Sequence, residues 1–325
     1  MSAPVVAAPR RWMVRLPTHL DAQVIGVYVL LLALTVIVAY ESPMFRTSDG
    51  LLGVYKQSAF FAILAVGQLV VMLGGGIDLS IGATAKLSAM ATAMVMSGQD
   101  SRLPAAIGVA VLVGIVVGLT NAFIVLALKV PPFIATFGVY YILQGVVFSI
   151  STEPVGRVAP AMYDFYTAQI LGIDAVNLAI VVFWIGVGLC FSHMVAIRRL
   201  YAVGGNEEAA RLAGINVNRV RLGSYVACSV LASLAGMYLL MRSGVAGPTT
   251  GDGAELAVIA AVVIGGVSLM GGRGTVIGVF GGVLLMQVIV AAFDYLQINT
   301  FYQEVIRGLL ILATVAVFVD RRSKA

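Results

Sequence analysis

The stretch RRLYAVGGNEEAARLAGINVNRVR, residues 198–221, interrupts a chain that is mostly apolar on both sides of it. It holds five Arg and two Glu, and on insertion scales each charge costs roughly 2.5–3.5 kcal/mol at the centre of a bilayer. A segment with this many charges does not span a membrane. We therefore predict that residues 198–221 lie in water between two membrane helices.

Residues 206–214 within this stretch have the composition of a short capped helix. Asn206 is a favourable N-cap, and Glu207 and Glu208 follow in the first turn, where carboxylates suit the positive end of the helix dipole. Gly214 is a natural stop after the last turn. The good helix formers between these ends include Ala209, Ala210 and Arg211.

Two interpretations of this short helix remain open from the residues alone. It is either a capped surface loop that joins two spans, or a docking helix for a soluble partner. In both interpretations we expect the pair Gly204–Gly205 to break the structure that precedes the helix.

The composition indicates a helical membrane protein. The chain has 325 residues, of which 60% are hydrophobic and 11% charged, whereas soluble domains carry about 25% charged residues. The apolar runs are continuous, as in helices that need roughly 20 residues to cross a bilayer, and do not alternate as in a β-barrel. Cys190 and Cys228 both lie in apolar runs, so we interpret them as core residues and not as a disulfide.

The apolar runs predict an all-α polytopic bundle of about ten transmembrane helices in one domain, residues 1–325. The second and eighth runs are short, and either could be re-entrant. The runs are 24–40, 58–73, 81–97, 104–128, 134–150, 177–197, 222–241, 254–270, 275–293 and 302–319.

The Lys and Arg residues predict the orientation of this bundle. With ten spans, 13 of the 20 basic residues fall on the side of the two tails, 1–20 and 320–325, and of the segment 198–221. Five fall on the other side and two within spans. The positive-inside rule then places both termini in the cytoplasm, and a charge that follows loops in this way does not indicate a nucleic-acid partner.

We find no catalytic, cofactor or metal site in the sequence. His19 and His193 lack metal-ligand spacing, and no Lys follows a Gly as in a phosphate-binding loop, so any ATP must be held by another subunit. Two charges fall within spans. We expect Lys86 to pair with Asp78 or Glu255, with a place on a transport path as the alternative. We expect Arg307 to pair with Glu304.

Glycine-rich breaks at 73–82 and 270–278 each separate a short apolar run from a longer one. Interrupted helices frame transport paths in many transporters, whereas small residues also serve close helix packing. The packing interpretation suits the glycines at 114–118 and 278–282. The first break supplies the candidate path residues, which are Gly74, Gly75, Gly76, Asp78 and Ser80.

Three motifs resemble the permease subunits of bacterial ribose-type monosaccharide ABC importers. GGGIDLSIG at 74–82 is similar to a signature of that family, and GGNEEAARLAGINVNRVR at 204–221 is similar to its cytoplasmic coupling segment. ELAVIAAVVIGGVSLMGGRGT at 255–275 is similar to its C-terminal signature. With the span pattern, the resemblance covers nearly the whole chain.

The resemblance implies a non-enzymatic, multi-pass permease of the bacterial inner membrane that moves a monosaccharide or similar small polar solute. It implies three protein partners: a cytoplasmic ATPase, a periplasmic solute-binding protein and a second permease, which is a copy or a paralogue. By motif match, Glu208, Ala209, Ala210 and Gly214 belong to the helix that docks in the ATPase. An ion-coupled secondary transporter is the alternative, although no ladder of acidic and basic residues for proton transfer is present in the sequence.

Overall fold

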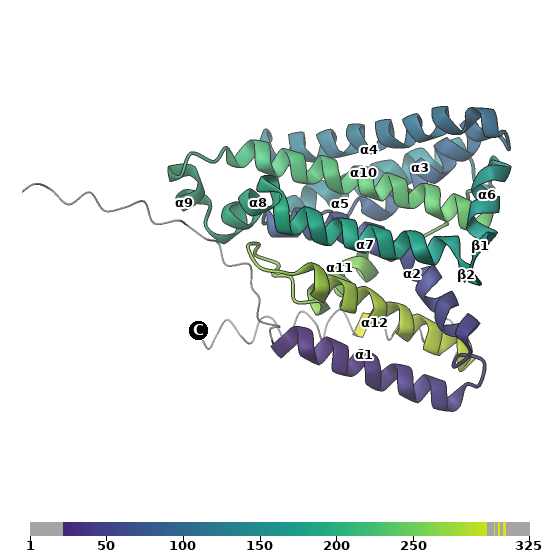
Figure 1. The fold of residues 1–325 in the computed structure, drawn as a ribbon. Helices are drawn as coiled ribbons and strands as arrows, with labels where there is room; N and C mark the ends of the chain where they lie inside the picture. The colour runs from purple at the N-terminus through teal and green to yellow at the C-terminus, as the bar shows by residue number, and fades with distance from the viewer. Residues whose placement is uncertain (1–21, 298–301, 303–304, 306–307, 310–325) are drawn as a thin grey trace, which may run out of the picture.

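The structure, a computed structural model, describes residues 22–297 together with residues 302, 305, 308 and 309 (Figure 1). Apart from turns, loops and one isolated β-bridge, its described part consists of helices and one hairpin, in which strand β1 (Gln169–Ile170) pairs antiparallel with β2 (Ile173–Asp174). The helices are α1 Ala22–Glu41, α2 Ser48–Leu73, α3 Ile81–Met96, α4 Leu103–Leu126, α5 Pro132–Ile150, α6 Pro160–Thr167, α7 Ala175–His193, α8 Val195–Gly205, α9 Glu207–Leu212, α10 Val217–Ser243, α11 Ala254–Ile264 and α12 Val276–Tyr295.

Seven helices of the described chain are long and apolar enough to cross a membrane: α1, α2, α4, α5, α7, α10 and α12. The second predicted span is therefore a full-length helix. By contrast, α3 and α11 have 16 and 11 residues. They are about 24 and 17 Å long, less than the hydrocarbon core of about 30 Å. The eighth predicted span, α11, thus stops well short of a crossing, and a count of ten spans is not confirmed.

Several predicted features lie outside the described residues. These are both tails, His19, most of the tenth span and the pair of Arg307 with Glu304.

The connection between the fifth and sixth predicted spans, residues 151–176, has regular structure of its own. It contains α6 and the β1–β2 hairpin, and Val155 forms a β-bridge with Ala246. The sixth span ends at His193, and the separate helix α8 follows it. The Gly204–Gly205 pair forms the last residues of α8, so the structure that precedes α9 ends there, as predicted.

Helix α8 is amphipathic. Its buried side chains are Ile197, Leu200 and Val203, whereas Arg198 and Arg199 are exposed. The apolar face of α8 packs against the bundle, and its 11 residues are too few to cross a bilayer. The sixth span therefore does not continue into α8.

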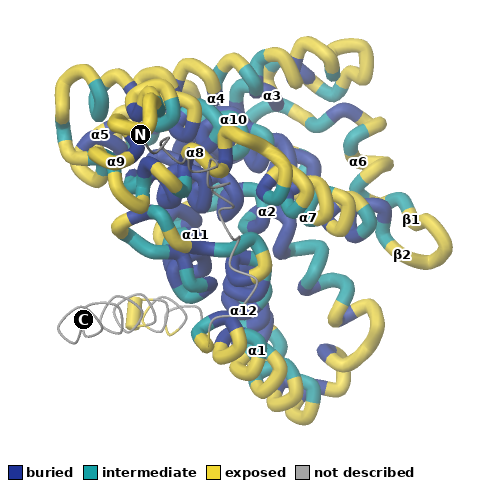
Figure 2. The backbone as a smooth tube through the Cα atoms, turned by 60° about the vertical axis from the view of Figure 1, so that its left-hand side comes forward, coloured by how far each residue is buried: buried dark blue, intermediate teal, exposed yellow. Residues whose placement is uncertain are grey.

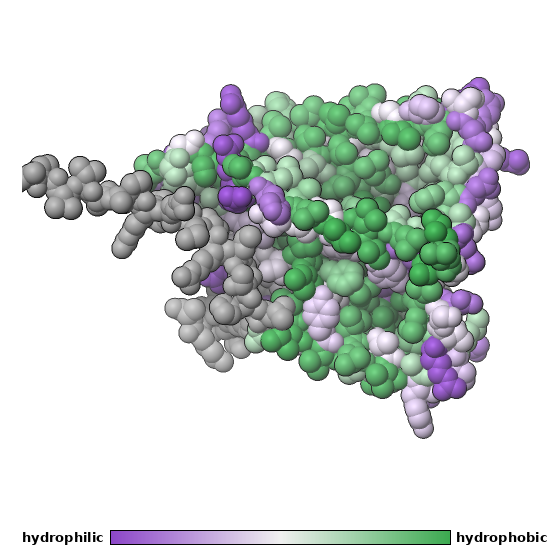
Figure 3. Space-filling model, in the orientation of Figure 1, coloured by the Kyte–Doolittle hydropathy of each residue, from purple (hydrophilic) through white to green (hydrophobic). Residues whose placement is uncertain are grey.

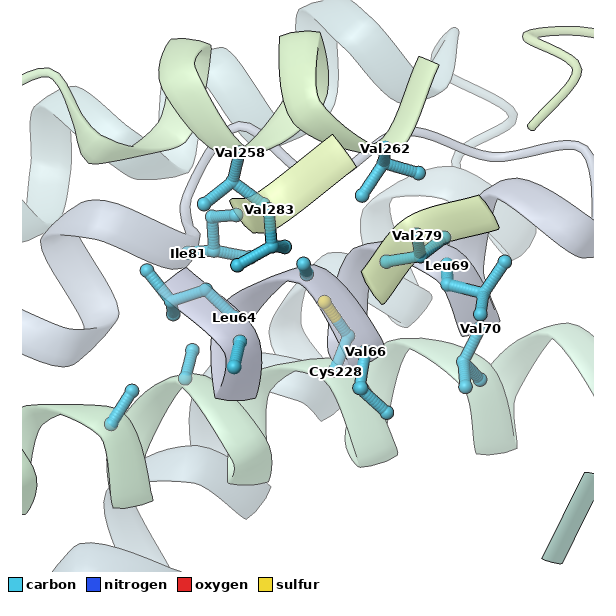
Figure 4. Close-up of a cluster of buried hydrophobic side chains, with 14 of the residues drawn as sticks. Leu64, Val66, Leu69, Val70, Ile81, Cys228, Val258, Val262, Val279 and Val283 are labelled. Carbon is cyan, nitrogen blue, oxygen red and sulfur yellow. The ribbon is translucent and has the colours of Figure 1, made fainter. Parts of the chain in front are cut away.

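The core lies around α2 and α10. Helix α10 packs against α2, α3 and α4, and α2 also packs against α11 and α12. Figure 2 shows buried residues along α2 and α12, and mostly exposed residues along α1. The close-up in Figure 4 shows valines and leucines of α2, α11 and α12 meeting Cys228 of α10. Both cysteines are free; Cys228 is a buried core residue as predicted, whereas Cys190 is exposed on α7.

The surface of the bundle has an apolar belt with a polar end on either side. Figure 3 shows hydrophobic side chains over the middle of the molecule and hydrophilic ones gathered at its two ends. One end carries α8 and α9, and the other carries α6 and the hairpin (Figure 1). We call these the α9 end and the α6 end.

Small residues bring α4 and α10 into close contact. A Cβ atom added to Gly114 would press on the backbone of Ser229 and Val230, and one added to Gly118 would press on the backbone of Val226. Gly278 and Gly282 of α12 approach the backbone of α11 and the turn after it in the same way. The packing interpretation of these glycines is confirmed.

We predict that Gly114→Leu lowers the free energy of unfolding by about 1–3 kcal/mol or more, because the added side chain must separate α4 from α10. Thermal unfolding of the purified protein in detergent measures the effect. Gly108→Leu on the same helix is the matched control, since nothing lies within 4 Å of a Cβ atom there. Equal stability of the two variants would contradict the close contact.

Candidate functional site

Helix α9 has the two ends that the sequence predicts. The Oδ1 atom of Asn206 accepts a hydrogen bond from the Ala209 amide at 2.9 Å. At the other end Gly214 has φ +79°, and its amide donates to the Arg211 carbonyl while the Ile215 amide donates to the Ala210 carbonyl. This paired arrangement is a Schellman motif, which closes the helix after only six residues.

One face of α9 is buried against the membrane domain, and the opposite face is exposed. Ala210 is buried and packs with Val203 of α8 and Val217 of α10. Glu208 and Ala209 are exposed, and Leu212 is 85% exposed. The predicted residue Ala210 thus faces the membrane domain, and Leu212, which sequence reasoning did not single out, projects from the α9 end. Its only signal in the sequence was a large apolar residue in the last turn of an otherwise polar helix.

Glu207 connects α9 to the membrane domain through Arg221. One carboxylate oxygen of Glu207 lies 2.6 Å from Arg211, and the other lies 2.9 Å from Arg221 of α10. The Nε atom of Arg221 donates to the carbonyl of Gly74 at 3.1 Å. Partial burial disfavours the Glu207 carboxylate, but the hydrogen bonds and charges of Arg211 and Arg221 outweigh it and lower its pKa. Glu207 is therefore ionised at neutral pH.

The two glycine-rich breaks of the chain meet beside this connection. The amide of Gly272 donates to the carbonyl of Leu73 at 3.0 Å, so the break before α12 is bonded to the break after α2. A Cβ atom on Gly204 of α8 would press on both of these groups. The hydroxyl of Tyr201 also donates to the carbonyl of Gly274, at 2.6 Å. We call this meeting of α8 with the two breaks the glycine joint.

The five predicted path residues have different surroundings. Gly75 and Gly76 border a cavity of about 320 Å³ between the α2–α3 break and the α4–α5 turn. Asp78 and Ser80 are fully buried, and the Asp78 carboxylate accepts from the Ser80 amide at 2.8 Å and the Ser80 hydroxyl at 2.6 Å. Asn121 of α4 donates to both side chains. These bonds fix the start of α3, since Asp78 forms a local turn with the backbone.

The partner of Lys86 differs from the prediction. Its ammonium group is paired with Asp252, which lies in the loop between α10 and α11, and it donates to the Gln144 side chain at 2.9 Å. Asp78 is instead bonded to Ser80, and Glu255 turns its carboxylate against Gly82. The structural pairing was expected, but a loop residue supplies it because the loop folds back over α3.

A second cavity, of about 360 Å³, lies at the α6 end beside this ion pair. Asp252 lines it together with Arg242, Phe60 and Phe61. The two rings are in edge contact with centroids 5.3 Å apart. Sequence reasoning missed this site, because its residues come from α2, α10 and the following loop and share no local motif.

Comparison with known proteins identifies the family. A family model described as branched-chain amino acid transport system / permease component matches residues 50–315, which run from the third residue of α2 past α12 and therefore include the glycine joint. The chain belongs to the permease family of ABC importers. No solved structure matches it.

The permease has relatives of similar length. It is 34% identical to the ribose import permease protein RbsC of Escherichia coli (strain K12) over 90% of this chain and 92% of the relative. It is 35% identical to the protein of the same name in Bacillus subtilis (strain 168), over 94% and 96%. The galactose/methyl galactoside import permease protein MglC of Escherichia coli (strain K12) is 31% identical over 90% and 92%. The chain is thus a multi-pass inner-membrane permease of an ABC importer.

We predict that Asp252→Asn lowers the stability of the permease by about 1–3 kcal/mol, because it leaves the buried Lys86 ammonium without its counter-charge. The lower part of that range is expected, since the Asp252 side chain is 47% exposed. The double variant Lys86→Met/Asp252→Asn should recover part of the loss, and Asp164→Asn, an exposed site at the same end, serves as control. A double variant less stable than Asp252→Asn would show that the pair is not the cause.

Proposed function

We propose that the permease moves a monosaccharide or a similar small polar solute, delivered by a periplasmic binding protein and driven by a separate cytoplasmic ATPase. The relatives carry the names of ribose and galactose import permeases, which supports this solute class. A neutral sugar needs few charges along its path, and this suits a membrane domain with few ionisable groups. A second permease, either a copy or a paralogue, completes the membrane part in this proposal.

The observation that carries the proposal is the chain of contacts from Glu207 through Arg221 to the carbonyl of Gly74. Helix α9 projects from the bundle, yet its first carboxylate pairs with Arg221, and Arg221 donates to the carbonyl of Gly74, the residue that begins the α2–α3 break. A force that displaces α9 is therefore delivered to this break and to the glycine joint beside it. This is the arrangement expected of a helix that an ATPase moves when it closes on ATP.

The same proposal places the α9 end in the cytoplasm. Of the described basic residues, seven lie at this end and five at the α6 end. The excess agrees with the positive-inside rule, and an ATPase that docks on α9 must be on this side. The α9-end residues are Lys129, Arg198, Arg199, Arg211, Arg219, Arg221 and Arg273.

We propose further that the solute passes beside the α2–α3 break, along Gly74, Gly75, Gly76, Asp78 and Ser80. The cavity beside Gly75 and Gly76 supports an opening at the α9 end. The cavity beside Asp252 and Phe60 supports one at the α6 end, where an aromatic ring and a carboxylate suit the apolar face and the hydroxyls of a sugar. In this proposal the bonds between Asp78, Ser80 and Asn121 close the path and are rearranged during transport.

Leu212→Glu is expected to weaken the association with the ATPase at least about tenfold, because it places a charge on the most exposed apolar side chain of α9. Co-purification of the two subunits and a binding titration measure the effect. Leu171→Glu is the control, because Leu171 is 99% exposed but lies in the hairpin turn at the α6 end. Unchanged ATPase binding by Leu212→Glu, or solute uptake driven by an ion gradient without any ATPase, would contradict the proposal.

Arg221→Gln is expected to leave the ATPase bound but to lower solute uptake per ATP hydrolysed about tenfold, a coupling loss of about 1.4 kcal/mol. Arg211→Gln is the matched control, since Arg211 also pairs with Glu207 but makes no bond to Gly74. The ratio of solute taken up to ATP hydrolysed is measured for each variant in proteoliposomes with the full transporter. Equal ratios in the two variants would rule out transmission through Arg221.

A further inference from the structure

A large cleft at the α9 end has no part in the contacts described above. Helices α7 and α10 both pack against α2, and α8 crosses their ends (Figure 1). Between them lies a cavity of about 960 Å³. Its floor includes Val66 and Val70 of α2, and its walls are formed by α7 and α10.

The cleft is apolar along its length and cationic at one end. Its deeper lining includes Phe183, Val187 and Leu231, whereas Arg199 and Arg219 line it where α8 and the start of α10 meet. Both arginines are exposed, and no carboxylate of the described chain lies within ion-pair distance of either one. Nearby Arg211 and Arg221 differ, because both of them pair with Glu207.

The depth of the cleft matches one leaflet of a bilayer. On α10 the lining runs from Arg219 to Leu231. Twelve helical steps cover about 18 Å. On α7 it runs from Phe191 to Phe183, about 12 Å by the same rise. Half of a hydrocarbon core of about 30 Å is about 15 Å. An acyl chain that enters beside the arginines therefore finds an apolar wall for its whole depth.

We propose that this cleft binds one anionic phospholipid of the leaflet at the α9 end. Its phosphate lies between Arg199 and Arg219, and one acyl chain follows the groove between α7 and α10. Unpaired basic groups between transmembrane helices are the recognised chemistry for anionic lipid headgroups, and an apolar groove alone would not distinguish one headgroup from another. The two features together select a lipid with a negative charge.

A lipid in this position contacts helix α8, which forms part of the glycine joint. Helix α8 closes the end of the cleft through Ile197 and Leu200, and the same helix carries Tyr201 and Gly204 into the glycine joint. A lipid in the groove fills the space between α7, α8 and α10 and holds α8 against α2. Its binding does not depend on which solute the permease carries.

The test uses the full-length permease, purified and stripped of lipid, with phosphatidylglycerol and phosphatidylcholine of identical acyl chains. Native mass spectrometry measures the bound lipid. We expect phosphatidylglycerol to bind at least about tenfold more tightly, and the preference to disappear in Arg199→Gln/Arg219→Gln. Arg198→Gln is the control, because Arg198 is exposed on the same helix but does not line the cleft. Equal affinity for the two lipids, or an unchanged preference in the double variant, would overturn the proposal.

A second variant tests the role of the apolar groove while both arginines are kept. Gly223→Leu places a side chain in the groove, where nothing lies within 4 Å of a Cβ atom, so folding is retained and is checked by thermal unfolding. We expect it to lower the affinity for phosphatidylglycerol at least about tenfold, whereas Gly145→Leu on α5, also in open space, leaves it unchanged. Full binding by Gly223→Leu would overturn the proposal. Equally tight binding of glycerol phosphate, which has no acyl chain, would do so as well.

Discussion

The hydrogen bond from the Gly272 amide to the Leu73 carbonyl joins two places where the helical backbone is interrupted inside the bundle. A backbone group left without a partner in an apolar interior costs several kcal/mol, so each break must find its partners within the protein. Here the two breaks supply each other, and Gly204 lets α8 approach them closely. This bond, and the lack of side chains around it, fix how the end of α2 and helix α8 meet the break before α12.

The short helix α9 is stabilised at both ends by local contacts that do not involve the bundle. Its cap at Asn206 and its Schellman motif at Gly214 satisfy backbone groups at both ends, which a helix of six residues otherwise leaves open to water. Glu207 then connects this capped helix to Arg221 and thus to Gly74. Local capping and one charged contact together hold α9 against the α2–α3 break, so it is not a loose loop between two spans, and the proposed coupling role rests on this connection.

The features that were predicted from the sequence are those that depend on neighbours along the chain. Asn206, Glu207 and Gly214 define α9 because caps and stops act within a few residues, and the apolar runs locate the long helices because each must match the bilayer. The glycine joint was not predicted, because its bond connects residues 73 and 272, and the sequence shows two breaks without showing that they touch. The partner of Lys86 was missed for the same reason, since Asp252 reaches it only after a loop folds back.

The segment between α11 and α12 also limits where residues can be inserted into this chain. Within residues 265–275 the backbone turns by bonds such as Val267 to Val262 and Ser268 to Arg273, and Gln23 of α1 donates to the carbonyls of Val263 and Ile264. An inserted residue there would break several of these pairs at once. The hairpin turn at Leu171 has no such ties and is almost fully exposed. We therefore expect inserted residues, epitope tags and spectroscopic probes to be tolerated at that turn and not in the interrupted segment.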